Sequence, residues 1–225
     1  MPRIATLISE VWTSSLKHTN RFKTFSVNYQ QSDNPVHWEL VSGQGQDVCS
    51  VLLFDRHKQN FILVKQFRPV VFLKSLENVP HDSDIIPKEV YSTEKGITWE
   101  LCSVKLSNNQ PDSTNKLCPK NLISLQNQVA NDVGYIINES NLTSVFRYRT
   151  MGSFVNLFVG EVDDSLRCDR SNASNVDPHI VPLDNVMGFI GDDSKPKVPD
   201  CAIAMLWWLN NNKHARRSDM SLISE

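Results

Sequence analysis

Two long apolar runs set the strongest limit on the fold of this chain. They are Val48–Phe54 and Phe61–Phe67, and the polar stretch Asp55–Asn60 separates them. Each run has the length of a strand and contains very few polar residues, which is typical of strands buried on both faces rather than on one. The sequence therefore predicts a buried central hairpin, which other elements of the chain must cover.

The remaining strands are predicted from alternating polarity and from turn signals. Phe22–Tyr29 alternates, Ser32–Pro35 is a strong turn signal, and Val36–Val41 is expected to return as the second strand of an N-terminal hairpin. Pro69 should end the second central strand, because proline lacks the amide that strand pairing needs. Later strands are predicted at Gly96–Cys102, Ser144–Arg149, Phe154–Val162 and Ile180–Leu183, and surface loops at Leu73–Lys95, Ser107–Thr114 and Asp163–Asp177.

One predicted helix carries a polar ridge beside its apolar stripe. Its apolar residues recur at spacings of three, four and four: Leu122, Leu125, Val129 and Val133. That spacing indicates a helix lying on a core, and Gly134 is expected to end it. Gln128, Asn131 and Asp132 lie three and four residues apart, so their side chains share one ridge. Such a ridge can hold a small ion.

The order of elements indicates an α+β protein. Leu183–Phe189 is expected to form one or two helical turns, and Ala202–Leu209 a final helix that packs on the sheet. Strands, one helix, more strands and a terminal helix predict a sandwich in which helices cover a mixed sheet. We expect one folded domain over residues 22–212, an N-terminal extension at residues 1–21 and a disordered tail at residues 213–225.

Composition excludes several classes of protein. With 225 residues and 40% hydrophobic content the chain can bury a single sizeable core. A net charge of −2 with 21% charged residues predicts neither a nucleic-acid surface nor a polybasic membrane patch. No apolar run approaches the roughly 20 residues of a membrane span, and no secretory signal is evident, so a cytoplasmic location is expected. The five scattered cysteines suggest neither a disulfide framework nor a zinc site.

Three segments, Ser50–Phe54, Ile62–Pro69 and Gly96–Cys102, together resemble the branch of the Nudix hydrolase family that splits nucleoside-diphosphate sugars such as UDP-glucose and ADP-ribose. Asn127–Tyr135 is similar to the end of the Nudix box, whose pattern is Arg-Glu-apolar-any-Glu-Glu-any-Gly-apolar. The resemblance implies a Nudix-type α/β/α sandwich with a mixed central sheet. It also implies a homodimer, in which the N-terminal strands, here Phe22–Val41, reach across to the partner.

The resemblance gives roles to two residues outside the box. Arg68 matches an arginine that contacts the phosphates or the terminal sugar of the substrate, and a planar guanidinium suits a diphosphate. Glu100 matches a glutamate that lies near the bound nucleotide. The alternative is that both residues lie at strand ends and are only solvated or paired.

The box itself departs from the family pattern. The family uses Mg²⁺ or Mn²⁺, held by carboxylates, to neutralise the diphosphate and activate water. Gln128 and Asn131 stand where glutamates are expected, and only Asp132 keeps a carboxylate. Two functions stay open. One is a metal-dependent nucleoside-diphosphate-sugar hydrolase, with these three residues at its catalytic positions and Asp132 as metal ligand. The other is a catalytically inactive Nudix-fold module that binds a nucleotide or another protein.

Overall fold

The computed structural model describes residues 22–31, 34–43, 46–76, 92–107, 117–150, 153–170 and 176–212. Its strands are β1 (Phe22–Gln31), β2 (Asn34–Gly43), β3 (Val48–Asp55), β4 (Asn60–Phe67), β5 (Ile97–Glu100), β6 (Cys102–Lys105), β7 (Leu142–Thr150), β8 (Ser153–Val162) and β9 (Asp177–Pro182). Its α-helices are α2 (Pro69–Lys74), α3 (Pro119–Val133), α4 (Val186–Ile190) and α5 (Pro199–Asn211). Four short 3-10 helices are η2 (Thr93–Gly96), η3 (Glu139–Asn141), η4 (Asp164–Leu166) and η5 (Leu183–Asn185).

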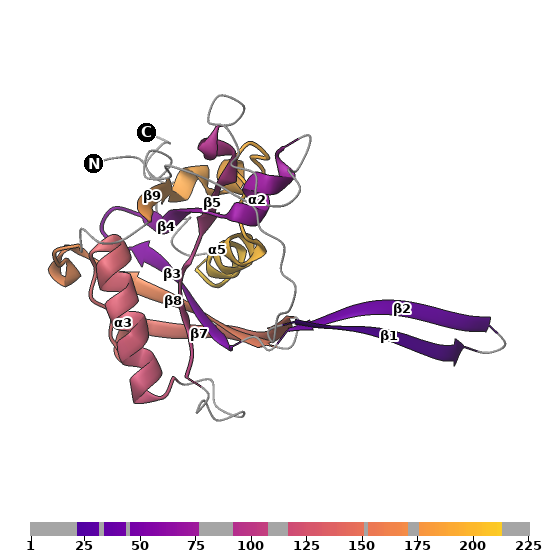
Figure 1. The fold of residues 1–225 in the computed structure, drawn as a ribbon. Helices are drawn as coiled ribbons and strands as arrows, with labels where there is room; N and C mark the ends of the chain where they lie inside the picture. Colours follow the sequence, from indigo (N-terminus) through magenta and orange to yellow (C-terminus); the bar gives the residue numbers. More distant parts are fainter. Residues whose placement is uncertain are drawn as a thin grey trace.

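Strand β3 lies inside a mixed seven-stranded sheet (Figure 1). It pairs in parallel with β8 over its whole length and antiparallel with β4 and β6. Strands β5 and β9 pair antiparallel with β4, and β7 pairs antiparallel with β8. The predicted central hairpin is confirmed, and all residues of β3 after Val48 are buried. A strand with neighbours at both edges and helices over both faces has no polar side, which explains its unbroken apolar run.

Two cores lie on the two faces of this sheet, and β3 contributes to both by alternation. Val51 and Leu53 join the core under α3, whereas Leu52 and Phe54 join the core under α4 and α5. Trp208 of α5 stacks near Phe54, with ring centroids 4.1 Å apart. The structure therefore has three layers, with α3 on one side of the sheet and α4 and α5 on the other (Figure 1). The predicted α+β fold with helices covering a mixed sheet is confirmed.

Helix α3 has clear local causes at both ends. Pro119 stands in its first turn, where the missing amide leaves no hydrogen bond unmade. Gly134 ends the helix in the left-handed conformation, with φ 74°, and its amide donates to the carbonyl of Ala130. The predicted stripe is confirmed, because Leu125, Val129 and Val133 are buried.

The N-terminal hairpin is a separate two-stranded sheet. Strands β1 and β2 pair antiparallel from Phe22 with Gly43 to Gln31 with Asn34, as the alternation predicts. Figure 1 shows this hairpin extending away from the seven-stranded sheet. The structure describes the backbone of these strands, so the hairpin is confirmed as a backbone feature.

Two predicted segments differ from the structure. The predicted strand Gly96–Cys102 divides at Leu101, because β5 pairs with β4 whereas β6 pairs with β3. The loop predicted from Leu73 begins too early, since α2 runs to Lys74. Pro69 ends β4 as expected and also opens α2 at its first position, a helix signal that the sequence interpretation passed over.

Several predictions fall outside the described residues. These are the N-terminal extension at residues 1–21, the tail at residues 213–225, and most of the loops after Leu76 and Ser107. Across the parts of the chain that are described, no helix has the length and apolar character needed to cross a membrane. All five cysteines are free thiols.

Candidate functional site

Arg68 and Glu100, placed far apart in the sequence, form an ion pair at the edge of the sheet. Strand β4 ends at Phe67, and the Arg68 amide donates to the carbonyl of Gly96 at 2.7 Å, which holds Arg68 beside the start of β5. Glu100 lies at the end of β5, opposite Val64. The Arg68 Nε donates to Glu100 Oε1 at 2.6 Å, and Arg68 Nη2 donates to Oε2. This is the two-point geometry in which a guanidinium and a carboxylate pair best.

The two partners of this pair differ in exposure. Glu100 is 4% exposed and also accepts a hydrogen bond from the Thr98 hydroxyl, whereas the Arg68 side chain is 44% exposed. The hydrogen bond to Glu100 raises the pKa of Arg68, against the opposing effect of burial. A guanidinium has five N–H donors, and this pair uses two of them. The buried carboxylate thus orients Arg68 and leaves its remaining donors on the solvent side.

The predicted ridge on α3 is only partly assembled. Gln128 Nε2 donates to Asp132 Oδ2 at 2.7 Å, so these two side chains meet as the four-residue spacing predicts. Asp132 is 6% exposed. Asn131, by contrast, is exposed to solvent. The structure brings Gln128 and Asp132 together and leaves Asn131 on the outer side of the helix.

The surroundings of Asp132 include residues that the sequence interpretation did not select. Burial raises the pKa of the Cys102 thiol, the nearby charge of Asp132 raises it further, and the positive charge of Arg170 acts in the opposite direction. Arg170 follows Cys168, whose amide donates to the Gly134 carbonyl at 3.0 Å. A guanidinium therefore lies near the C-terminal end of α3. Because Arg170 comes from a loop predicted only as polar, no local pattern could have pointed to it.

A second buried carboxylate lies beyond the helix end. Tyr135 Oη donates to Asp55 Oδ2 at 3.1 Å, and the Asp55 carboxylate also accepts from the amides of His57 and Lys58. The hydrogen bonds from the two amides to Asp55 stabilise the turn between β3 and β4. Burial and this hydrogen bond raise the pKa of Tyr135.

The donors at the box positions do not fit a resident Mg²⁺ or Mn²⁺ ion. Mg²⁺ prefers hard carboxylate oxygens in a near-octahedral arrangement, and neutral amide oxygens stabilise the bound ion less. The three positions offer one carboxylate and two amides. The Asp132 Oδ2 already accepts a hydrogen bond from the Gln128 amide, and Asn131 is exposed to solvent. Among the described residues, no group of three or more His, Cys, Asp or Glu side chains is placed to hold a metal.

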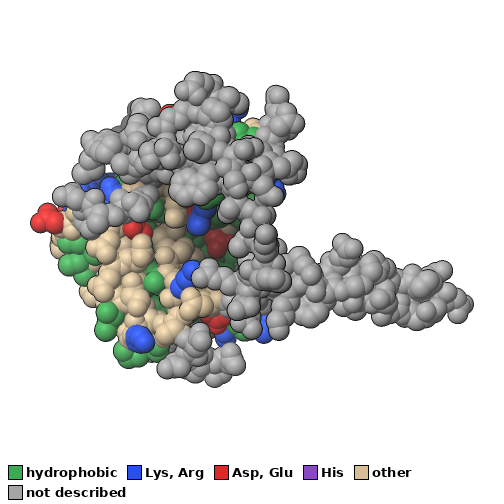
Figure 2. All heavy atoms as spheres, viewed as in Figure 1, with side chains coloured by type: hydrophobic (Ala, Val, Ile, Leu, Met, Phe, Trp, Pro, Cys, Tyr) green, Lys and Arg blue, Asp and Glu red, His purple; other side chains and the backbone are tan. Residues whose placement is uncertain are grey.

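Charge on the visible surface is dispersed. Figure 2 shows the Lys and Arg side chains drawn in colour spread over the face in view rather than gathered in one patch. Recognition of an anionic ligand on this face would therefore depend on individual, well-oriented cations rather than on a field of positive charge.

Comparison with known proteins finds distant relatives, although no family model matches the chain. The chain is 23% identical over 203 residues to the uridine diphosphate glucose pyrophosphatase NUDT14 of Bos taurus, covering 82% of this chain and 86% of the relative. It is 21% identical over 214 residues to the protein of the same name from Mus musculus, covering 86% and 90%.

A solved structure supports the same fold. An ADP compounds hydrolase superposes with a TM-score of 0.51 at 12% sequence identity, covering 90% of this chain and 95% of that one. At that identity the likeness concerns the fold alone. The chain is therefore similar in sequence to uridine diphosphate glucose pyrophosphatases and in fold to an ADP compounds hydrolase, which agrees with its resemblance to Nudix hydrolases.

Proposed function

We propose that this chain binds nucleoside-diphosphate sugars through Arg68 and does not hydrolyse them with a metal ion. The orientation of Arg68 by buried Glu100 carries the proposal. A diphosphate offers pairs of oxygens to the fork of a guanidinium, and a guanidinium already held in place loses little side-chain freedom on binding. The substrate class is that of the pyrophosphatase relatives.

The residues at the box positions do not favour metal-dependent hydrolysis. Cleavage of a diphosphate needs its charge neutralised and a water activated, which in this chemistry requires a divalent ion among several carboxylates. Gln128 and Asn131 contribute no charge, and Gln128 bonds to the one carboxylate that remains. Binding can persist after such changes, because Arg68 and Glu100 lie on other elements.

A second candidate is hydrolysis of UDP-glucose and ADP-ribose with Mg²⁺ or Mn²⁺. It is favoured by likeness to uridine diphosphate glucose pyrophosphatases over 82% of the chain. In this reading Gln128, Asn131 and Asp132 would be the catalytic positions, with Asp132 as metal ligand.

One experiment separates the two functions. The full chain is titrated with UDP-glucose and with ADP-ribose in a calorimeter, first with a chelator and then with Mg²⁺ or Mn²⁺, and the mixtures are analysed for UMP and AMP. We expect binding under both conditions, about tenfold weaker in Arg68→Ala and unchanged in Arg167→Ala, with no product. Metal-dependent release of UMP or AMP would support the hydrolase instead. Failure of both ligands to bind would contradict both functions.

We further propose a homodimer assembled through the hairpin β1–β2. Among the described strands, β1 and β2 pair only with each other, so the outer edge of each has no strand beside it. An open strand edge offers backbone donors and acceptors that a second copy can satisfy. Light scattering at micromolar concentration should give twice the mass of one chain, and a monomer mass would contradict the proposal.

A further inference from the structure

Arg170 lies at the C-terminal end of α3, on the face of the sheet that α3 covers. A Cβ added at Gly134, the residue that ends α3, would lie 3.6 Å from the Arg170 Cβ. Arg170 Nη2 donates to the carbonyl of Val176, and Val176 is buried in the core under α3. The side chain of Arg170 therefore runs from the end of the helix towards the start of β9.

The start of β9 lies beside the strand end that leads to Arg68. In the antiparallel pairing of β4 with β9, Lys65 is opposite Asp177. The next positions along the two chains are Gln66 and Val176, so Val176 lies one step closer to Arg68. Strands lie about 4.8 Å apart and rise about 3.3 Å per residue, which puts the backbones of Val176 and Arg68 about 8 Å apart. The Arg170 guanidinium, held at the Val176 carbonyl, is therefore near Arg68.

Both guanidiniums belong to the same face of the sheet. Glu100 is opposite Val64, and Val64 belongs to the core under α3. Side chains directly opposite each other on paired strands share a face, so Glu100 and the Arg68 guanidinium bonded to it face α3 as well. Cys102, in the same core, is within electrostatic range of Arg170. One ligand on this face can therefore meet both arginines.

The Arg170 guanidinium has donors that the described residues leave unused. Its Nε is buried and, within the described part of the chain, has no hydrogen-bond partner. Buried donors in native proteins are nearly always paired, so an unpaired one points to a water molecule or a ligand. Arg170 as a whole is partly exposed, so an anion can approach its guanidinium from solvent.

We propose that Arg170 is a second phosphate-binding residue, which together with Arg68 binds the diphosphate of a nucleoside-diphosphate sugar. This role rests on the function proposed above and adds a residue to the same site. Two guanidiniums on one face can each take oxygens from one of the two phosphates. They also supply positive charge to the diphosphate without a divalent ion.

Arg170 further offsets the negative charge of Asp132 at this end of α3. The two charges act in opposite directions on the pKa of the Cys102 thiol, so both lie within reach of the same point. The Asp132 carboxylate would repel a diphosphate bound nearby, and a guanidinium beside it reduces that repulsion. Loss of the Arg170 charge should therefore weaken binding partly through Asp132.

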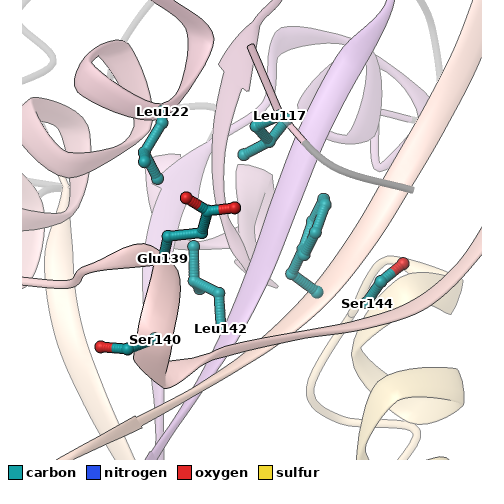
Figure 3. Close-up of a pocket in the computed structure, with 7 residues that line it drawn as sticks. Leu117, Leu122, Glu139, Ser140, Leu142 and Ser144 are labelled. Carbon is teal, nitrogen blue, oxygen red and sulfur yellow. The ribbon is translucent and has the colours of Figure 1, made fainter. Parts of the chain in front are cut away.

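A cavity elsewhere on α3 offers a control for the place of binding. It has a volume of about 700 Å³ and lies beside the N-terminal half of the helix. Figure 3 shows Leu117, Leu122 and Leu142 around it. Leu122 and Gly134 are twelve residues apart, which corresponds to about 18 Å along the helix axis. A diphosphate bound by Arg68 and Arg170 does not enter this cavity.

The test measures binding of inorganic pyrophosphate and of UDP-glucose to the full chain by calorimetry in the presence of a chelator. Arg170→Gln removes the charge but keeps an amide that can donate to the Val176 carbonyl, and Arg170→Lys keeps the charge. We expect both ligands to bind about tenfold more weakly to Arg170→Gln and about threefold more weakly to Arg170→Lys. The matched control Arg167→Gln removes an exposed guanidinium three residues earlier and should leave both affinities unchanged.

Two more variants separate a role in binding from a role in the fold. Asp132→Asn added to Arg170→Gln should recover about threefold in pyrophosphate affinity, because it removes the repelling charge. A purely structural role of Arg170 would give no recovery and would overturn the proposal. Leu122→Phe narrows the cavity and should leave both affinities unchanged, and weaker binding would place the ligand in the cavity instead.

The two ligands also distinguish this role from the proposed function. Pyrophosphate binding that depends on Arg170, without binding of UDP-glucose, would support the role of Arg170 and contradict the proposed function. UDP-glucose binding that depends on Arg68 and is unchanged in Arg170→Gln would overturn the role of Arg170 alone. Failure of both ligands to bind the wild-type chain would overturn both.

Discussion

Glu100 and Asp132 are carboxylates of nearly equal burial with different partners. Glu100 is 4% exposed and Asp132 is 6% exposed. Glu100 receives two hydrogen bonds from the Arg68 guanidinium, whereas Asp132 accepts a hydrogen bond from the neutral amide of Gln128. Because a buried carboxylate is costly unless it is paired, the partner decides how much each position depends on its charge. The sheet edge holds a complete two-point ion pair, whereas the three box positions on α3 hold one carboxylate and two amides.

The largest effect should come from breaking the ion pair. Arg68→Ala leaves Glu100 buried beside Thr98 without its cation, and we expect a loss of about 3 kcal/mol in the free energy of unfolding. That is the low end for such a change, because Arg68 is 44% exposed and water can partly replace it. Denaturant unfolding at neutral pH measures the loss.

Arg167→Ala serves as a matched control for that loss. Arg167 pairs with Asp164 through its Nε at 3.0 Å, but both side chains are 55% exposed. An exposed pair contributes at most about 1 kcal/mol. Equal losses for the two variants would mean that Glu100 does not depend on Arg68.

The second effect concerns the backbone at the helix end rather than its charges. Gly134 has φ +74°, and a Cβ placed there would lie 2.9 Å from the carbonyl oxygen of Cys168. Gly134→Ala should therefore lower the free energy of unfolding by about 2 kcal/mol. Gly191→Ala is the control, since a Cβ there meets only the Met187 carbonyl at 3.5 Å. If thermal melting shows similar shifts for both, the end of α3 is not held as tightly as its contacts indicate.

Local periodicity in the sequence predicts part of the fold and of the candidate site. The stripe and the stop of α3, the hairpin β3–β4 and the short spacing of Gln128 and Asp132 follow from periodicity within about a dozen residues, and each is seen in the structure. The pairing of Arg68 with Glu100 joins residues 32 apart in sequence, and the division of the predicted strand at Leu101 reflects a change of partner from β4 to β3. Local patterns carry no information on which strand lies beside which.

The nearby charge of Arg170 and the cavity beside α3 could not be predicted for a similar reason. Arg170 comes from an irregular segment after η4, which the bridge between Tyr135 and Arg167 and the hydrogen bond from the Cys168 amide to the Gly134 carbonyl bring to the helix end. The cavity is shaped by residues from α3, η3 and two strands. The local sequence around each of those residues is typical of an ordinary core or surface position.

A smaller effect is expected from removing the charge at the helix end. Asp132→Asn keeps the shape of the side chain and can still bond with Gln128, so we expect a loss of about 1 kcal/mol. Glu100→Gln leaves Arg68 without its opposite charge and should lose about 2 kcal/mol. Paired denaturant curves measure the difference. A greater loss for Asp132→Asn would reverse the comparison, since Asp132 would then be the carboxylate whose charge the fold requires.

The smallest effect comes from adding carboxylates where the Nudix pattern has them. Gln128→Glu with Asn131→Glu places two further carboxylates within four residues of Asp132 on α3. Their mutual repulsion should lower the melting temperature in a chelator, and Mg²⁺ or Mn²⁺ should restore it. With a dissociation constant of about 5 mM, 10 mM metal would add about 0.6 kcal/mol to the free energy of unfolding. The wild-type protein should show no such dependence.

The control for this last prediction adds the same charges one turn earlier. Ser124→Glu with Asn127→Glu has the same three-residue spacing but leaves Gln128 bonded to Asp132, so its melting temperature should respond to metal no more than that of the wild type. If the box variant and the wild type give coincident curves of melting temperature against metal concentration, positions 128, 131 and 132 do not face a common ion. The likeness of Asn127–Tyr135 to the Nudix box would then extend to its apolar and glycine positions only. If the box variant responds alone, the helix still has the geometry of a metal site, and substitution of its ligands is what removed it.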